Sequence, residues 1–197
     1  IVSYNDSFAY DTVAPNDPWI TNDSGSTNTI SGIATAATAD TLTYHAVAAS
    51  GAATELHTAA QFDLGVDVNG TSVPSHWAYF TQPVADGSYL VINDTDAAGN
   101  QQSTLYLRST TGETTVDLSR AGLANFDFGT IDLSASHATL SLTEAQINRL
   151  TGADHQMAIH GGADDHVNLI GAVNTGHAQT INGESYHLYT LGSSGAS

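Results

Sequence analysis

Short runs of alternating hydrophobic and polar residues recur along the chain, and clusters of turn-forming residues separate them. Segments such as NDSGS, VNGTS and DAAGN fall between the runs, and Gly, Asn, Asp and Ser in such clusters indicate turns. This many short strands within about 100 residues is typical of an immunoglobulin-like β-sandwich. In the first half, the runs predict strands near residues 3–10, 18–21, 28–34, 41–48, 60–67, 76–81, 88–94 and 102–109.

The pattern changes after the polar segment STTGET, residues 109–114, which we interpret as a joint between two parts of the chain. Further strands are predicted for FDFGTIDLS, ATLSL, QMAIHG, DHVNLIG, HAQTI and SYHLYTL. The pair Asn182–Gly183 predicts a two-residue hairpin turn between the last two strands. One short helix is predicted at 143–150, where Thr143 caps the first turn and Glu144 complements its dipole.

These patterns together predict an all-β fold, an immunoglobulin-like β-sandwich followed by a second small β-rich domain with one short helix. For the second domain they leave two architectures open, a small sandwich and a short solenoid-like stack. The segment DGSYLV adds a detail within the first domain. Its Tyr89 follows a turn and opens a strand, as in a tyrosine corner whose phenol bonds back to the chain, although an ordinary turn before a strand has the same pattern.

The charge of the chain narrows the possible functions. Twenty acidic residues face three Arg and no Lys, which gives a formal net charge of −17. Nucleic acids and anionic membrane surfaces need a basic footprint, so we expect neither as a partner. No apolar run approaches the about 20 residues of a membrane-spanning helix, so membrane insertion is not expected. The acidic surface suits either simple solvation or partial neutralisation by divalent cations, which take oxygen ligands.

Several segments carry a family likeness. YDTVAPNDPWI resembles the linker that opens tandem bacterial Ig-like repeats, and HWAYFTQPVADGSYLVINDTDAAGN resembles the second half of such a repeat. NFDFGTIDLSASHATLSLTEAQINRLTG, MAIHGGADDHVNL and INGESYHLYT resemble a β-rich segment near the C-terminal end of giant RTX, biofilm-associated adhesins exported by type I secretion. The resemblance implies that residues 1–10 end a preceding module, 11–110 form an Ig-like domain, and 113–197 form the C-terminal-region domain.

In an Ig-like sandwich, the chain entry and three loops lie at one end, so acidic residues from distant segments should converge there. Unpaired carboxylates in one place would raise each other's pKa, and a Ca²⁺ ion with six to eight oxygen ligands would remove that cost. The resemblance implies the same ion, because calcium stiffens the joints of such adhesins. The alternative is that these are solvated turn residues. The predicted ligands are Asp11, Asp40, Asp67, Asn69, Asp94, Asp96 and Asn100.

Other chemistry has weaker signals. His155, His160 and His166 with Asp164 and Asp165 could bind Zn²⁺ or Ni²⁺, but exposed His on strands is the simpler interpretation. The chain has no Cys, no Lys and no Gly-x-Ser-x-Gly motif, so we do not expect an enzyme. Aromatic residues could stack on sugars, although such residues usually form the core or cross-strand pairs. They are Trp19, Trp77, Tyr44, Tyr79, Tyr186 and Tyr189.

The sequence thus favours a non-catalytic, calcium-stiffened extender or joint segment of a secreted bacterial adhesin. Such a segment would lie outside the cell, at the bacterial surface, with neighbouring modules of the same adhesin as its partners. It would serve cell adhesion and biofilm formation. The alternative is a module of the adhesin that binds a polysaccharide or a host surface, and a row of exposed aromatic residues on one sheet face would favour it.

Overall fold

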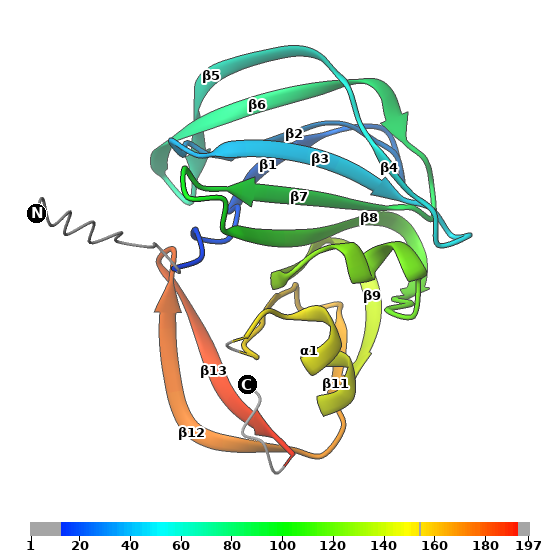
Figure 1. Cartoon of the computed structure of the whole chain (residues 1–197), viewed down its shortest axis with the longest axis vertical. Helices are drawn as coiled ribbons and strands as arrows, with labels where there is room; N and C mark the ends of the chain where they lie inside the picture. The colour runs from blue at the N-terminus through cyan, green and yellow to red at the C-terminus, as the bar shows by residue number, and fades with distance from the viewer. Residues whose placement is uncertain (1–12, 154, 193–197) are drawn as a thin grey trace, which may run out of the picture.

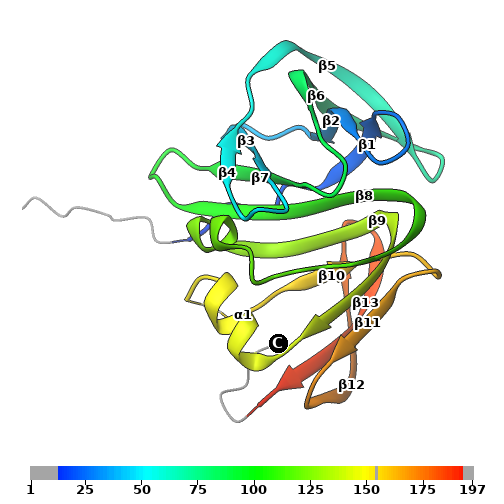
Figure 2. The same cartoon turned by 90° about the vertical axis from the view of Figure 1, so that its right-hand side faces the viewer.

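The computed structural model describes residues 13–153 and 155–192, and the strand expected at 3–10 lies outside these ranges. The expectation of an all-β fold is confirmed, because β-strands dominate and one short α-helix accompanies them. Among the described residues, no helix is long and apolar enough to cross a membrane. Figures 1 and 2 show the β-sandwich on one side of strands β8 and β9, and the C-terminal half on the other side.

The first half forms an immunoglobulin-like sandwich of two sheets. One sheet has the strand order β1-β2-β6-β5, and the strands that face it have the order β8-β7-β3-β4. Each predicted strand within the described residues has a counterpart, and the short β4 is additional. The bounds are β1 Ile20–Ser24, β2 Ile30–Ala36, β3 Thr41–Val47, β4 Ala53–Glu55, β5 Thr58–Val68, β6 Thr71–Val84, β7 Tyr89–Thr95 and β8 Gln101–Thr115.

Hydrophobic residues at alternate positions form the core between the two sheets. Ile33, Ala78, Leu90 and Ile92 each have an exposed fraction of 0%. In a strand, successive side chains point to opposite faces, so these inward positions alternate with outward ones. Strand β7 departs from this pattern, because its outward-facing residues are buried as well.

The C-terminal half covers the outer face of the second sheet. Val91 on β7 and Leu105 on β8 belong to a second core, together with Leu133 and Leu140 of β9 and Ile147 of the helix. The sheet that contains β7 and β8 therefore separates two cores and contributes side chains to both. This explains why strand β7 is apolar along most of its length rather than alternating.

Strand β9 (Phe128–Leu142) continues the second sheet by pairing in parallel with β8. Strands β10 (Ala158–His160) and β11 (His166–Leu169) pair in parallel with β9, which completes a sheet of seven strands. Residues 109–114, expected to be a joint, lie inside β8, and the pairing with β9 is irregular between Ser109 and Thr114. The polar residues therefore extend β8 past the predicted strand end at 109, as a part of the strand with irregular pairing.

The predicted helix and hairpin are confirmed. Helix α1 (Glu144–Leu150) begins with a capping box, in which Thr143 Oγ1 accepts from the Gln146 backbone and Gln146 Oε1 accepts from the Thr143 backbone. Strands β12 (Ala172–Ile181) and β13 (Glu184–Leu191) form a separate antiparallel pair. Asn182 and Gly183 join them with φ values of 52° and 85°, as a type I′ turn requires.

Tyr89 does not form a tyrosine corner. Its hydroxyl accepts a hydrogen bond of 2.6 Å from the backbone N–H of Asp117, which follows β8 rather than preceding the tyrosine. The guanidinium of Arg120 lies 3.6 Å from the centre of the Tyr89 ring, a cation–π contact. Arg120 also donates to the Val47 carbonyl oxygen. The prediction failed because the Tyr89 hydroxyl bonds to the C-terminal half of the chain. The tyrosine-corner motif describes a bond within one domain, so it does not predict such a partner.

Candidate functional site

A cavity of about 410 Å³ lies where the chain entry, the sandwich and the C-terminal half meet. The segment before β1 supplies Asp17 to its lining, and the β2–β3 connection supplies Asp40. Asp94 comes from the end of β7, Asp132 from β9 and His160 from β10. Four carboxylates from four distant segments of the sequence therefore line one cavity.

Asp94 has the most unusual environment of these residues. Its exposed fraction is 3%, and its Oδ1 atom has no hydrogen-bond partner. Burial, together with the nearby charges of Asp40 and Asp96, raises the pKa of Asp94 to about 6. A buried carboxylate oxygen without a partner is costly, because it has lost water and gained no compensating donor or cation.

The surroundings of Asp94 offer oxygen atoms rather than cationic groups. The Thr35 hydroxyl oxygen is also buried without a hydrogen-bond partner, and Thr35 lines the same cavity. The Thr38 hydroxyl donates to Asp40 Oδ2 at 3.3 Å. Neither Lys nor Arg lines the cavity. A hard cation is the partner that such a set of oxygen atoms fits best.

Two acidic residues of the cavity were missed by the sequence analysis. Thr130 Oγ1 donates to Asp17 Oδ2 at 2.8 Å. Asp132 is buried, its Oδ1 accepts from the backbone and hydroxyl of Ser134, and its burial raises its pKa. The only sequence signal of both residues was their acidic character. Asp132 was missed because β9 reaches the cavity through a parallel pairing with β8, which hydrophobic patterns do not specify.

The predicted ligands do not all reach the cavity. Asp40 and Asp94 line it, as expected from the two loops that they flank. Asp96 instead closes its own turn, accepting from the Asn100 side chain at 2.8 Å, which holds its pKa below the usual value. Asp67 accepts from the backbone of Gly70 in the β5–β6 turn, where Asn69 has a φ of 52°. Asp11 lies outside the described residues.

Within residues 13–153 and 155–192, no three His, Asp or Glu side chains are grouped closely enough to form a metal site. The histidine-based Zn²⁺ or Ni²⁺ site therefore has no assembled ligand cluster there. Asp165 has a structural role, since its Oδ1 accepts from the Ala138 backbone and its Oδ2 from the Gly162 backbone. Calcium binding stays a prediction. Of the predicted ligands, Asp40 and Asp94 are the two described residues that line the cavity.

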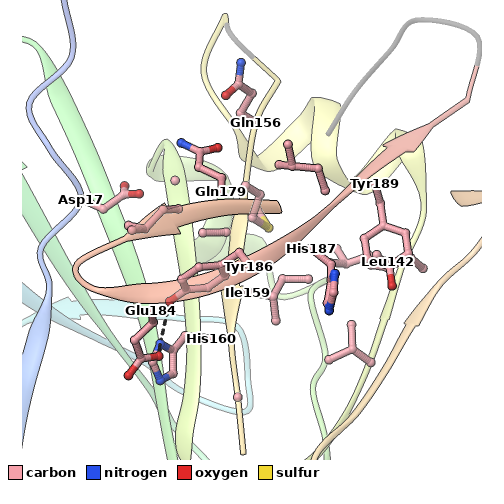
Figure 3. Close-up of a pocket in the computed structure, with 18 of the residues that line it drawn as sticks. Asp17, Leu142, Gln156, Ile159, His160, Gln179, Glu184, Tyr186, His187 and Tyr189 are labelled. Carbon is pink, nitrogen blue, oxygen red and sulfur yellow. Dashed lines mark hydrogen bonds and ion pairs between the residues drawn. The ribbon is translucent and has the colours of Figure 1, made fainter. Parts of the chain in front are cut away.

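The aromatic residues considered for sugar stacking do not form an exposed row. Tyr44 and Trp77 are buried, with exposed fractions of 3% and 8%. Tyr79 lies between Phe62 and Trp77, with stacked contacts to both rings. Tyr186 and Tyr189 line a second cavity, beneath the β12–β13 hairpin, which Figure 3 shows. The rings of Tyr44, Trp77 and Tyr79 thus pack largely against other side chains of the protein.

The raised pKa of Asp94 predicts a pH dependence of stability without divalent cations. The folded state binds the proton more tightly than the unfolded state, whose Asp pKa is close to 3.8. We therefore expect this contribution to stability to be complete below about pH 4 and to be lost as the pH rises through about 6. Urea unfolding in EDTA at several pH values, with wild type and Asp94→Asn, measures it. The substitution should remove this part of the pH dependence, and identical profiles would contradict the assignment.

Comparisons with known proteins give little guidance. No family model matches this chain, and no curated protein matches it. Among solved structures, it is similar to one described as the archaellum periplasmic stator protein complex FlaF and FlaG from Sulfolobus acidocaldarius. The match covers 53% of this chain and 99% of that chain, with 13% sequence identity and a TM-score of 0.27. Similarity this weak carries no argument about fold or function.

Proposed function

We propose that this chain is a non-catalytic extender or joint segment of a secreted bacterial surface adhesin, and that Ca²⁺ stiffens it. The observation that carries the proposal is Asp94, a buried carboxylate with an unpartnered oxygen beside Asp40. It lines a cavity that the entry segment, the sandwich and β9 share. A cation held there would contact the β2–β3 connection and the end of β7, and it would lie close to the entry segment and β9.

In this proposal, the residues that line the cavity of Asp94 have different roles. Asp94 and Asp40 hold the cation, the Thr35 hydroxyl offers a further oxygen, and Asp17 and Asp132 supply nearby negative charge. The ion neutralises the carboxylates and favours the arrangement in which the entry segment is held against the body. Asp11, Asp67, Asn69, Asp96 and Asn100 remain predicted ligands from the sequence, of which Asp96 and Asn100 already bond to each other.

The resemblance to adhesins supports a location outside the cell, with neighbouring modules of the same protein as partners. Calcium is scarce inside cells and abundant outside. A segment whose folded state gains stability from the ion would stay easier to unfold before export and become stiff after it. Such a segment would hold a distal binding domain away from the cell surface.

Thermal unfolding with Ca²⁺ and with EDTA tests the proposal. An ion present at 100 times its dissociation constant adds about 2.7 kcal/mol to stability. For a chain of this size, that corresponds to a rise in melting temperature of about 5–11 °C. Calorimetric titration of the chelated protein with Ca²⁺ should show binding in parallel.

Matched variants locate the ion. Asp40→Asn and Asp94→Asn should each abolish or strongly reduce the calcium-dependent shift. Asp86→Asn removes an exposed charge at the opposite end of β7 and should leave the shift unchanged. Equal melting temperatures with calcium and with EDTA would contradict the proposed stiffening. A shift that persists in both cavity variants would place the ion elsewhere.

A further inference from the structure

The second cavity, of about 530 Å³, lies between the β12–β13 hairpin and the body of the C-terminal half (Figure 3). Consecutive residues of two strands form its walls. Met157 to Gly162, which include β10, line it on the side of the body. Glu184 to Tyr189 of β13 line it on the side of the hairpin. A volume of this size is in the range of sites that bind small ligands or short segments.

Both wall strands have an unpaired edge. In the described structure, β10 pairs with β9 alone, and β13 pairs with β12 alone. No described backbone hydrogen bond joins β10 to β13. A strand with one neighbour has a row of N–H and C=O groups available for another strand. The cavity therefore lies between a strand of the seven-stranded sheet and a strand of the two-stranded sheet, which contact each other through side chains and are not paired through their backbones.

The floor of the cavity is apolar and belongs to the core. Leu142, Ile147 and Leu191 line it, with exposed fractions of 0%, 3% and 2%. Met157 and Ile159 are partly buried and pack against the same core. An extended segment in the cavity could place every second side chain on this floor, because successive side chains of a strand alternate between faces.

The negative charge of the cavity lining favours basic residues at the positions of an incoming segment that do not face the apolar floor. Asp17, Asp165 and Glu184 line the cavity, whereas none of the three Arg residues does. Glu184 lies 3.4 Å from His160 Nδ1, and His160 also bonds to the Tyr186 hydroxyl. Basic side chains on an incoming segment would find acidic partners, and a second copy of this acidic chain would not be favoured.

From these observations we propose that the cavity binds an extended peptide segment of a partner protein, with alternating apolar and basic residues, as an added β-strand. The segment's backbone pairs with the edges of β10 and β13, its apolar side chains contact the floor, and its Lys or Arg side chains face the carboxylates. A two-stranded sheet such as β12–β13 is marginal alone, and the added strand would connect it to the seven-stranded sheet.

Titration of the full chain with a defined probe tests this proposal. The probe is an acetylated and amidated eight-residue peptide of alternating Val and Lys, and the readout is amide hydrogen exchange with NMR shifts. We expect protection of amides in 158–160 and 184–191. A peptide with Glu in place of Lys should bind at least tenfold more weakly. The Val–Lys peptide N-methylated at each Val should bind at least tenfold more weakly, because it keeps the Lys donors but cannot donate hydrogen bonds along the edge that the Val residues face.

Variants of the protein separate the site from general attraction to an acidic surface. Glu184→Gln should weaken binding about two- to fivefold, the scale of a partly exposed ion pair. Asp86→Asn, an equal change of charge outside the cavity, should leave binding unchanged. Ala158→Phe should block binding by occupying the cavity, with its melting temperature as the check of folding.

Four results would overturn the proposal. They are no shift at millimolar peptide, equal binding of the N-methylated peptide, equal weakening by Asp86→Asn and Glu184→Gln, and protection of β10 and β13 by neutral oligosaccharides but not by the Val–Lys peptide.

Discussion

A fragment that ends at residue 111 should fail to fold into a stable domain, although it contains the whole of residues 11–110, which resemble an Ig-like repeat. The cut removes β9, the parallel partner of β8, along with the residues that cover the outer face of the sheet. Val91, Leu105 and Leu107 would then become exposed, whereas each has an exposed fraction of at most 1% in the whole chain. An apolar face of this kind favours aggregation or a loosely packed state.

Circular dichroism, urea unfolding and binding of the dye ANS measure this expectation. The fragment should bind ANS and unfold without a sharp transition, whereas a fragment ending at residue 192 should resemble the full chain. A cooperative transition of fragment 1–111, with a stability close to that of the whole chain, would contradict the shared-core interpretation. The Ig-like part would then be an independent unit that merely contacts its neighbour.

Leu105→Ala should be the most destabilising of the simple substitutions that we consider. Leu105 is 1% exposed, lies opposite Ile131 of β9 and opposite Val91 of β7, and belongs to the second core. Loss of a buried leucine side chain leaves a cavity and costs about 2–5 kcal/mol. Both halves should unfold in one transition, at a lower urea concentration than in the wild type. The reason is that Leu105 lies in the core between the shared sheet and the C-terminal half.

The exposed Leu64 provides a matched control for this substitution. Its exposed fraction is 57%, so Leu64→Ala should change stability by less than about 0.5 kcal/mol. Tryptophan fluorescence reports on the sandwich, where Trp77 lies, and far-UV circular dichroism reports on the whole chain. Separate transitions by these two probes in Leu105→Ala would show that the halves unfold independently, against our expectation.

Much of the fold was predictable, since local signals agree with the final structure. Alternation located the strands of the sandwich, Thr143 and Gln146 form the cap of α1, and Asn182–Gly183 forms the hairpin turn. Such features depend on residues a few positions apart. The short β4 was missed because a strand of three residues, here Ala-Thr-Glu, is too short to show an alternating pattern.

What could not be predicted depends on long-range pairing. The polar end of β8 has no hydrophobic alternation, so its pairing with β9 gave no signal in the sequence. The same pairing brings Asp132 to the cavity of Asp94 and explains why Asp132 was overlooked. Asp40 and Asp94 were found because their strands are adjacent in the sandwich, where Leu42 lies opposite Asp94.

The passage of β8 from the sandwich into its pairing with β9 has a mechanical consequence. Two domains joined by a linker can pivot about it, but here a pivot between the halves would break backbone hydrogen bonds of β8 and β9 and separate a packed core. The angle between the halves is thus set by the sheet rather than by an ion. In a longer array under tension, a chelator would loosen the entry segment near Asp17. The two halves joined by β8 and β9 would still move together as one inflexible link.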